Sequence, residues 1–214
     1  MIAIRPVSAA QLCDLQDRLE PVYRQCFSAP PWNETDEEIA DYPARLARHT
    51  GHPGSYGFVA EEGAELAGAI YGWPAPACLP EASAFDLAVR DAVSPAVAAL
   101  LVAPAVVVAE LMVAPAFHRR GIGRTLLAEY VAGRSRAWLA THPGAGAVAL
   151  YESEGWVRRA AYVASGTPLV LYTYQASPPR DTPALPAPGQ GSACGPVRRR
   201  SATRPNRRPP SRPV

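Results

Sequence analysis

Residues 106–130, VVVAELMVAPAFHRRGIGRTLLAEY, contain the features that decide the fold. Their first part is mostly aliphatic or β-branched and stops before Pro115, which predicts a buried strand. Leu126, Leu127 and Tyr130 then recur at helical spacing, which predicts one buried face of a helix. The stretch therefore predicts a strand, a glycine-containing turn and a helix in direct succession.

The turn between this strand and this helix has the composition of an anion site. Glycines at positions 121 and 123 leave no Cβ atom between a ligand and the backbone, and the first N–H groups of a helix have no partner within it. The helix dipole adds about half a positive charge at that end, so a pyrophosphate group is predicted to bind here. The predicted contacts come from His118, Arg119, Arg120, Gly121, Ile122, Gly123 and Arg124.

Two better-known glycine motifs do not match this turn. A P-loop needs a lysine followed by Ser or Thr, and the chain contains no lysine. A dinucleotide fingerprint needs a third glycine where Leu126 stands. The remaining alternative is an ordinary strand-to-helix turn whose arginines contact solvent.

The segment resembles the acetyl-coenzyme A signature of the GNAT superfamily of N-acetyltransferases, Gln/Arg-x-x-Gly-x-Gly/Ala after a strand ending in V-x-P. His118 stands at the Gln/Arg position. A second segment, 147–156, resembles the other signature of that superfamily through Ala147, the Leu-Tyr pair at Tyr151, and the final Gly-Trp; its usual first Asn is Gly144 here. Two signatures in family order are more specific than either alone.

The resemblance covers residues 1–174 and implies a fold of the α/β (α+β) class. The implied fold is a mixed, mostly antiparallel sheet of six to seven strands, flanked by helices and splayed where the cofactor binds. Residues 1–175 are thus predicted to be a GNAT N-acetyltransferase domain. Residues 176–214 carry ten prolines, and their eight arginines and one acid give a net charge of +7, so a disordered Pro/Arg-rich tail is predicted.

In the family reaction, the amine nitrogen of an acceptor attacks the acetyl thioester and the coenzyme A thiolate leaves. An amine with a pKa near about 10 must first lose a proton, so the reaction requires a base. Glu110 is the ionisable residue of an otherwise apolar strand beside the cofactor turn, and it is the predicted base. A glutamate that faces solvent is the alternative, because strand alternation alone does not direct its side chain to the cleft.

The resemblance implies two further roles. The Tyr151 hydroxyl is predicted to protonate the leaving thiolate, and a packing role for its ring is the alternative. The backbone amides of Met112 and Val113, where family members splay, are predicted to contact the oxyanion and the pantetheine arm. No metal site is predicted, because the four cysteines form no C-x-x-C pair and have no histidines at metal spacing.

The N-terminal part of the chain predicts helices interrupted by proline. A strand over 2–7 precedes a capping box at Ser8–Gln11, and Pro21 predicts a break in the following helix. A second capping box at Thr35–Glu38 opens another helix, which Pro43 weakens. Further strands are predicted over 56–60, 66–71, 137–140, 161–164 and 169–174, and helices over 84–93 and 144–154.

The predicted function is transfer of the acetyl group of acetyl-CoA to a primary amine, by direct attack in a ternary complex. The acceptor is a small molecule or a peptide or protein amine, and the arrangement is compatible with a homodimer. An acidic cluster suits a cationic acceptor, although a solvated helix face is the favoured explanation. This cluster consists of Glu34, Asp36, Glu37, Glu38 and Asp41.

Two other classes of function are weighed against this one. A catalytically degenerate acyl-CoA-binding regulator is disfavoured because Glu110 and Tyr151 are both present. A nucleic-acid-associated protein acting through its arginine tail is disfavoured because the rest of the chain is acidic, with 13 arginines and 18 acids. The longest apolar run is too short to span a bilayer, and the absence of a secretory signal favours the cytoplasm.

Overall fold

The computed structural model describes residues 1–176, so the predicted tail lies outside the described residues apart from Ala176, and the division at residue 175 stays a prediction. One sheet has the strand order β1-β2-β3-β4-β5-β7-β6. Every neighbouring pair is antiparallel except β4 and β5, which are parallel. This confirms the predicted mixed, mostly antiparallel sheet. The strands are β1 (Ile2–Ser8), β2 (Tyr56–Glu62), β3 (Glu65–Pro74), β4 (Val106–Val113), β5 (Arg136–Thr141), β6 (Val157–Ala164) and β7 (Thr167–Gln175).

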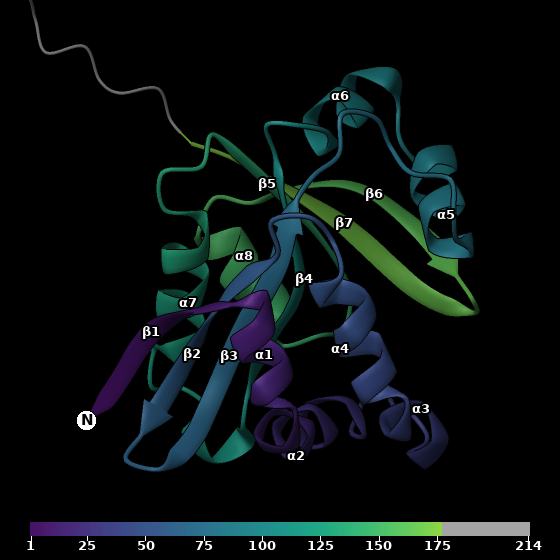
Figure 1. Cartoon of the computed structure of the whole chain (residues 1–214). Helices are drawn as coiled ribbons and strands as arrows, with labels where there is room; N and C mark the ends of the chain where they lie inside the picture. Colours follow the sequence, from purple (N-terminus) through teal and green to yellow (C-terminus); the bar gives the residue numbers. More distant parts are fainter. Residues whose placement is uncertain (177–214) are drawn as a thin grey trace, which may run out of the picture. The chain divides into compact units, whose positions relative to one another are not determined.

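Helices cover both faces of this sheet (Figure 1). The N-terminal helices contact β2, β3 and β4 from one side, and α7 contacts the same three strands from the other. No helix within residues 1–176 has the length and hydrophobicity needed to cross a membrane. The helices are α1 (Ala9–Asp14), α2 (Gln16–Phe27), α3 (Asp36–Ala40), α4 (Tyr42–Thr50), α5 (Ala84–Ala92), α6 (Pro95–Leu101), α7 (Ile122–Val131) and α8 (Ala147–Ser153).

Aromatic side chains form the core between the N-terminal helices and the sheet. Tyr23 of α2, Tyr42 of α4 and Tyr71 of β3 are fully buried, and the rings of Tyr23 and Tyr42 stack with centroids 4.3 Å apart. Tyrosine carries a polar hydroxyl into the interior, and such a hydroxyl needs a partner. This core therefore brings hydrogen-bonding groups close to the middle of β4.

The sheet is splayed between its two parallel strands. β4 and β5 pair only at Val106–Ala137 and Val107–Trp138, although β4 continues to Val113 and β5 to Thr141. Beyond Val107 the edge of β4 that faces β5 has no strand partner among residues 1–176. The open end of this split adjoins the turn that leads into α7, as the sequence predicts for the cofactor site.

Two prolines act differently from the sequence prediction. The predicted break at Pro21 instead occurs at Leu15, between α1 and α2, and Pro21 lies inside α2. A single proline removes one helical N–H, and α2 still buries four side chains on its inner face. Pro43 begins the separate helix α4 rather than weakening one long helix, because the first turn of a helix tolerates a missing N–H.

Two other segments extend or correct the prediction. The helix predicted over 144–154 begins at Ala147, because the N–H of Gly144 and that of Ala145 are both held by His142 in a turn. The segment 75–105 between β3 and β4, of which only a helix over 84–93 was predicted, carries both α5 and α6. Ser94 is the N-cap of α6, and its hydroxyl accepts the Val97 N–H.

Candidate active site

Glu110 owes its orientation to an irregularity in β4. Tyr71 of β3 pairs with Glu110, whereas the next residue, Gly72, pairs with Val108, so Ala109 is an extra residue in β4. Such a bulge interrupts the alternation of side chains along a strand. It places the carboxyl of Glu110 among side chains of the N-terminal helices, which strand alternation alone does not predict.

Burial raises the pKa of the half-buried Glu110 carboxyl to about 7. The guanidinium of Arg45 opposes this shift because it favours the charged carboxylate, and the carboxylate of Glu34 adds to it. A carboxyl whose pKa lies near neutrality is divided between its acid and base forms at physiological pH. It is therefore suited to accept a proton there.

Arg45 belongs to a hydrogen-bonded cluster that the sequence did not predict. Its Nη1 lies 2.9 Å from Oε1 of Glu34, and the Tyr23 hydroxyl donates to Oε2 of Glu34 at 2.7 Å. The guanidinium also donates to the Tyr23 hydroxyl oxygen and lies over the Tyr23 ring. These three residues come from α2, the following loop and α4, and no motif links them in the sequence. The cluster fixes a positive charge on the Glu110 side of the sheet.

The backbone of β4 offers amide donors to the split. The Ala114 N–H donates to Ala67 of β3, and strand amides alternate in direction. The N–H of Met112 is therefore directed toward β3, and those of Leu111 and Val113 toward the split. Sequence reasoning selected Met112 and Val113, and it missed Leu111 because the alternation has no reference point until one hydrogen bond of the strand is known.

The turn before α7 has the geometry of an anion site. Gly121 is the N-cap of α7 and adopts a left-handed backbone conformation with φ of 78°. A Cβ atom at this position would have no atom within 4 Å, so the space beside it is open. Ile122 is buried with 4 % of its surface exposed, which anchors the helix start and leaves its first N–H groups directed outward.

The charged side chains of this turn are divided between two roles. Arg120 forms a two-pronged ion pair with Glu62 of β2, at 2.7 and 3.0 Å, and Arg124 lies 2.7 Å from Glu154. Arg119 has no ion pair within residues 1–176. It therefore carries the positive charge of the turn that no carboxylate of the described chain neutralises.

His118 has a structural contact in this turn. Its Nε2 lies 2.8 Å from the carbonyl oxygen of Val113, so the imidazole ties the turn to the end of β4. The thiol of Cys26 in α2 donates to the same carbonyl at 3.3 Å. The His118 side chain thus holds the loop in shape, in addition to any backbone contact that the position makes.

Tyr151 lies on α8, and the two signature segments meet in space. A Cβ on Gly123 would lie 3.5 Å from the Leu150 side chain and 3.7 Å from that of Val113, so α7, α8 and β4 converge there. Tyr151 is buried with 4 % of its surface exposed. Burial raises the pKa of its hydroxyl, and the charge of Glu110 raises it further. The hydroxyl is therefore protonated at neutral pH.

Four of the five residues of the acidic cluster have partners within the fold. Glu34 pairs with Arg45, Asp36 with Arg24 at 2.8 Å, and Asp41 with Arg48 at 3.1 Å. Glu38 accepts the N–H of Thr35 as part of the capping box of α3. These four carboxylates therefore contribute to the local structure of α3, α4 and the preceding loop, whereas Glu37 has no ion pair within residues 1–176.

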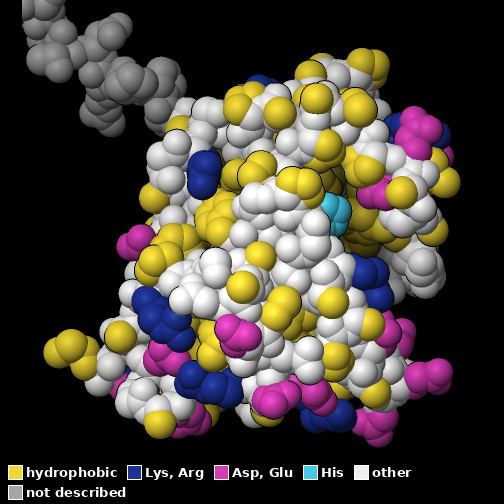
Figure 2. All heavy atoms as spheres, in the orientation of Figure 1, with side chains coloured by type: hydrophobic (Ala, Val, Ile, Leu, Met, Phe, Trp, Pro, Cys, Tyr) yellow, Lys and Arg dark blue, Asp and Glu magenta, His cyan; other side chains and the backbone are white. Residues whose placement is uncertain are grey.

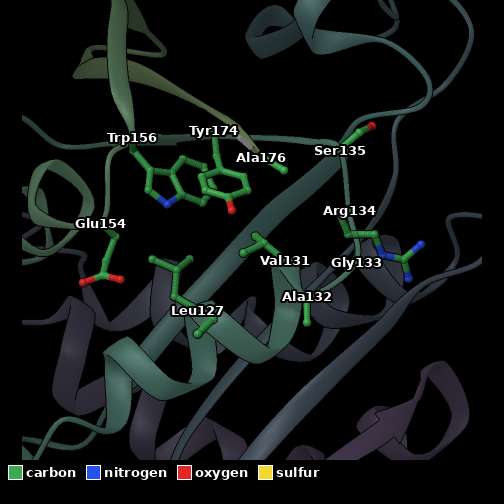
Figure 3. A pocket seen from close by; sticks show the side chains of 11 residues that line it. Leu127, Val131, Ala132, Gly133, Arg134, Ser135, Glu154, Trp156, Tyr174 and Ala176 are labelled. Atoms are coloured by element: carbon green, nitrogen blue, oxygen red, sulfur yellow. The ribbon is translucent and has the colours of Figure 1, made fainter. Parts of the chain in front are cut away.

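A groove lies at the other end of α7. It has a volume of about 470 Å³ and runs between Leu127 and Val131 of the helix on one side and Trp156 and Tyr174 on the other (Figure 3). Gly121 and the amides of β4 are not among its lining residues. The groove is therefore separate from the anion site at the helix start.

Comparison with known proteins agrees with this geometry. The model of the acetyltransferase (GNAT) family matches residues 16–156. No curated protein matches the chain significantly. Among solved structures, the PaiA N-acetyltransferase from Thermoplasma acidophilum in complex with coenzyme A has a TM-score of 0.52 and 14 % identity, over 82 % of this chain and 99 % of its own.

Two other solved structures show the same fold. An acetyltransferase from Thermus thermophilus has a TM-score of 0.52 and 16 % identity, over 82 % of this chain and 97 % of its own. Aminoglycoside 6'-acetyltransferase type Ii has a TM-score of 0.54 and 16 % identity, over 82 % of this chain and 98 % of its own.

A strand, turn and helix that form an anion site, with a carboxyl beside the split sheet, define an acyltransferase of the coenzyme A-dependent type. The match over most of the chain shows that it belongs to the acetyltransferase (GNAT) family, which confirms the resemblance inferred from the sequence. The protein is an acyltransferase, and acetyl-CoA is its co-substrate.

Proposed function

We propose that the protein transfers the acetyl group of acetyl-CoA to a primary amine by direct attack, with both substrates bound together. One observation carries this proposal: a carboxyl with a pKa of about 7, that of Glu110, lies beside the split between β4 and β5. The residues around the split fit a coenzyme A group. Gly121, the start of α7 and Arg119 would hold its pyrophosphate, and β4 its pantetheine arm.

Glu110 acts as the base in this proposal. An acceptor amine arrives protonated, and its nitrogen has no lone pair for attack until one proton leaves. The Glu110 carboxylate accepts that proton, directly or through a water molecule, and becomes the neutral acid that its buried surroundings favour. Arg45 limits the shift, so the carboxylate is still populated at neutral pH.

Backbone donors of β4 then stabilise the developing charge. Acetyl-CoA supplies the acetyl thioester, whose carbonyl oxygen becomes negative when nitrogen bonds to its carbon. The N–H groups of Leu111 and Val113 are directed into the split and are fixed by the β3–β4 pairing. Fixed donors aimed at developing charge typically contribute a factor of about 10² to 10³ in rate.

Tyr151 completes the proton inventory. When the carbon–sulfur bond breaks, its electron pair leaves on sulfur, and the thiolate needs a proton. The Tyr151 hydroxyl is protonated at neutral pH and lies within electrostatic range of Glu110, so it is the proposed donor. After the attack, the nitrogen still carries one proton more than the amide product needs. Loss of that proton, through water, to the tyrosinate restores the Tyr151 hydroxyl, and Glu110 returns its own proton to solvent.

Thermal denaturation with acetyl-CoA, coenzyme A, ATP and NAD tests the proposal. Acetyl-CoA at about 100 times its dissociation constant is expected to stabilise the fold by about 2.7 kcal/mol. Release of free thiol in the presence of a primary amine is the expected activity. Stabilisation by ATP or NAD without any by acetyl-CoA, or thiol release that does not depend on amine, would overturn it.

A further inference from the structure

A platform of aromatic rings lies along β3 from the proposed base. The imidazole of His52 stacks on the indole of Trp73 with centroids 3.8 Å apart and planes 11° apart, and the His49 ring lies 5.3 Å away. Trp73 stands two residues after Tyr71, which pairs with Glu110. Two strand residues span about 7 Å, so the platform begins at about that distance along the sheet from the carboxyl.

The insertion 75–105 brings further aromatic side chains to this region. Phe85 of α5 meets Tyr162 of β6 edge to face, with centroids 6.3 Å apart. A small cavity of about 30 Å³ lies under the insertion, and Trp73, Phe85 and Trp138 are among its walls. A volume of this size has room for a single small polar group or water molecule.

Two polar atoms in this region are buried without a hydrogen-bond partner in the described chain. They are Nε1 of Trp138, whose side chain lines the cavity, and the hydroxyl of Tyr162; a third such atom, Nδ1 of His49, belongs to the platform itself. Trp138 has only 7 % of its surface exposed. Buried donors are nearly always paired in folded proteins, so each of these atoms calls for a partner that residues 1–176 do not supply.

The charges around the platform are mixed. Glu34 and Asp36 pair with Arg45 and Arg24, and Asp86 of α5 accepts the Ser83 N–H and hydroxyl as a helix cap. Arg45, His49 and His52 face the same side of the sheet, and none of them attracts a second cationic group. The half-buried Glu110 carboxyl is the proposed partner of a single ammonium group.

The ring faces remain reachable from outside. His52 is exposed, and Trp73, Phe85 and Tyr162 are half-buried. Figure 2 shows a recess in the surface with hydrophobic side chains at its depth and a histidine at its edge. We propose that the acceptor is a small primary amine with an aromatic ring on a short linker, its ring bound between α4 and the insertion against Trp73. This inference rests on the proposed function.

The length of the linker follows from the geometry. The amine must reach Glu110 while the ring lies on Trp73, and the two positions are separated by about two strand residues, or about 7 Å. A two-carbon linker spans this interval, as in 2-phenylethylamine or tryptamine.

An amine panel assayed with the full chain tests the proposal. The panel is 2-phenylethylamine, tryptamine, n-butylamine, spermidine and kanamycin, each with acetyl-CoA and detection of free thiol. The aromatic amines are expected to have kcat/KM at least about tenfold above n-butylamine, which has the same amine without a ring. Equal or better turnover of n-butylamine, spermidine or kanamycin would overturn the inference and leave the proposed function standing.

Substitutions of Trp73 and Phe85 test where the aromatic ring of the acceptor binds. Trp73→Leu and, separately, Phe85→Leu are expected to raise KM for 2-phenylethylamine roughly tenfold, with little change for n-butylamine, because only the aromatic acceptor loses a stacked partner. Leu87→Ala, on the exposed face of the same α5, is the matched control and should change neither. An equal rise for both amines, or an equal effect of Leu87→Ala, would contradict a ring site.

A binding measurement separates this inference from the proposed function. Quenching of tryptophan fluorescence by 2-phenylethylamine and by n-butylamine needs no turnover. If no amine is acetylated, the proposed function fails, yet ring-dependent quenching that Trp73→Leu removes still supports the aromatic site. Identical quenching by the two amines in the unmodified protein would reject the site, whatever the activity.

Discussion

The two sides of the split sheet are built on different principles. On the cofactor side, the end of β4, the turn at Gly121 and the start of α7 are consecutive in the chain, and backbone groups form most of the site. On the proposed acceptor side, Arg45, Trp73 and Phe85 come from distant segments, and side chains would form the site. A backbone site tolerates sequence change as long as the glycines remain, whereas a side-chain site changes its ligand with each substitution. The difference explains how one fold keeps its cofactor while varying its acceptor.

The largest expected effect comes from the cofactor side. Gly121→Glu places a side chain and a negative charge where the pyrophosphate is proposed to bind, so acetyl-CoA binding by calorimetry should become undetectable. Gly133→Glu is the matched control, because Gly133 also has a positive φ, of 70°, and open space around its Cβ, but follows the other end of α7. Equal loss in both variants would attribute the effect to backbone strain.

Glu110→Gln tests the proposed base, which lies between the proposed cofactor and acceptor sites. It keeps the shape of the side chain and removes its basicity, so kcat/KM at neutral pH should fall by about 10² to 10⁴. In the unmodified protein, activity should rise with pH through about 7, because only the carboxylate accepts a proton. The variant should lose this rise and recover partly at higher pH, where more acceptor is neutral. An unchanged pH profile would remove Glu110 from the mechanism.

Glu110→Gln should lower activity but raise the free energy of unfolding. The pKa of Glu110 in the folded protein is about 7, above the ordinary range, so ionisation disfavours folding as pH rises from about 4 through 7. Above pH 7, Glu110→Gln should therefore be more stable than the unmodified protein by about 1 to 3 kcal/mol in urea denaturation. The gain should disappear below about pH 4, where the carboxyl is neutral in both the folded and unfolded states. A variant less stable at pH 8 would show that the carboxylate is not penalised by burial.

Tyr151→Phe removes one hydroxyl and keeps the ring. If the hydroxyl is the acid, kcat should fall by about 10² while acetyl-CoA affinity stays the same, and the defect should shrink on the alkaline side, where a thiolate needs a proton less. Normal turnover at every pH would assign Tyr151 to packing alone. A loss confined to acetyl-CoA affinity would make it a cofactor anchor.

The smallest expected effect is a difference in acetyl-CoA affinity between variants of two arginines in the same turn. Arg119→Ala should weaken acetyl-CoA binding about tenfold and reduce its salt dependence, because its charge has no partner in the described chain. Arg124→Ala should weaken binding less, since Arg124 already pairs with Glu154. The reverse order in calorimetric titrations at two salt concentrations would show that the Arg124 ion pair opens to meet the cofactor.

Local patterns predicted most elements, and long-range packing produced the exceptions. Both N-terminal capping boxes, at Ser8 and Thr35, form as predicted, because each depends on residues three apart. The breaks near Pro21 and Pro43 were misjudged, since the apolar face that a helix buries decides whether a proline is tolerated inside it or placed at its start. α6 went unpredicted because its apolar run resembles a strand or a loop until its partners are known.

The sequence by itself determined the fold family of this protein and predicted its cofactor site. A strand, a glycine turn and a helix lie within residues 106–130, and an anion site made of backbone groups needs nothing from elsewhere in the chain. Only the tertiary structure decided the direction of the Glu110 side chain, because the bulge at Ala109 that sets this direction arises from the pairing of β4 with β3. Tertiary structure also determined that Leu111 rather than Met112 directs its amide to the split, and that Arg45 and Trp73 share one side of the sheet. These contacts join residues that are distant in the chain, and local sequence carries no physical signal of them.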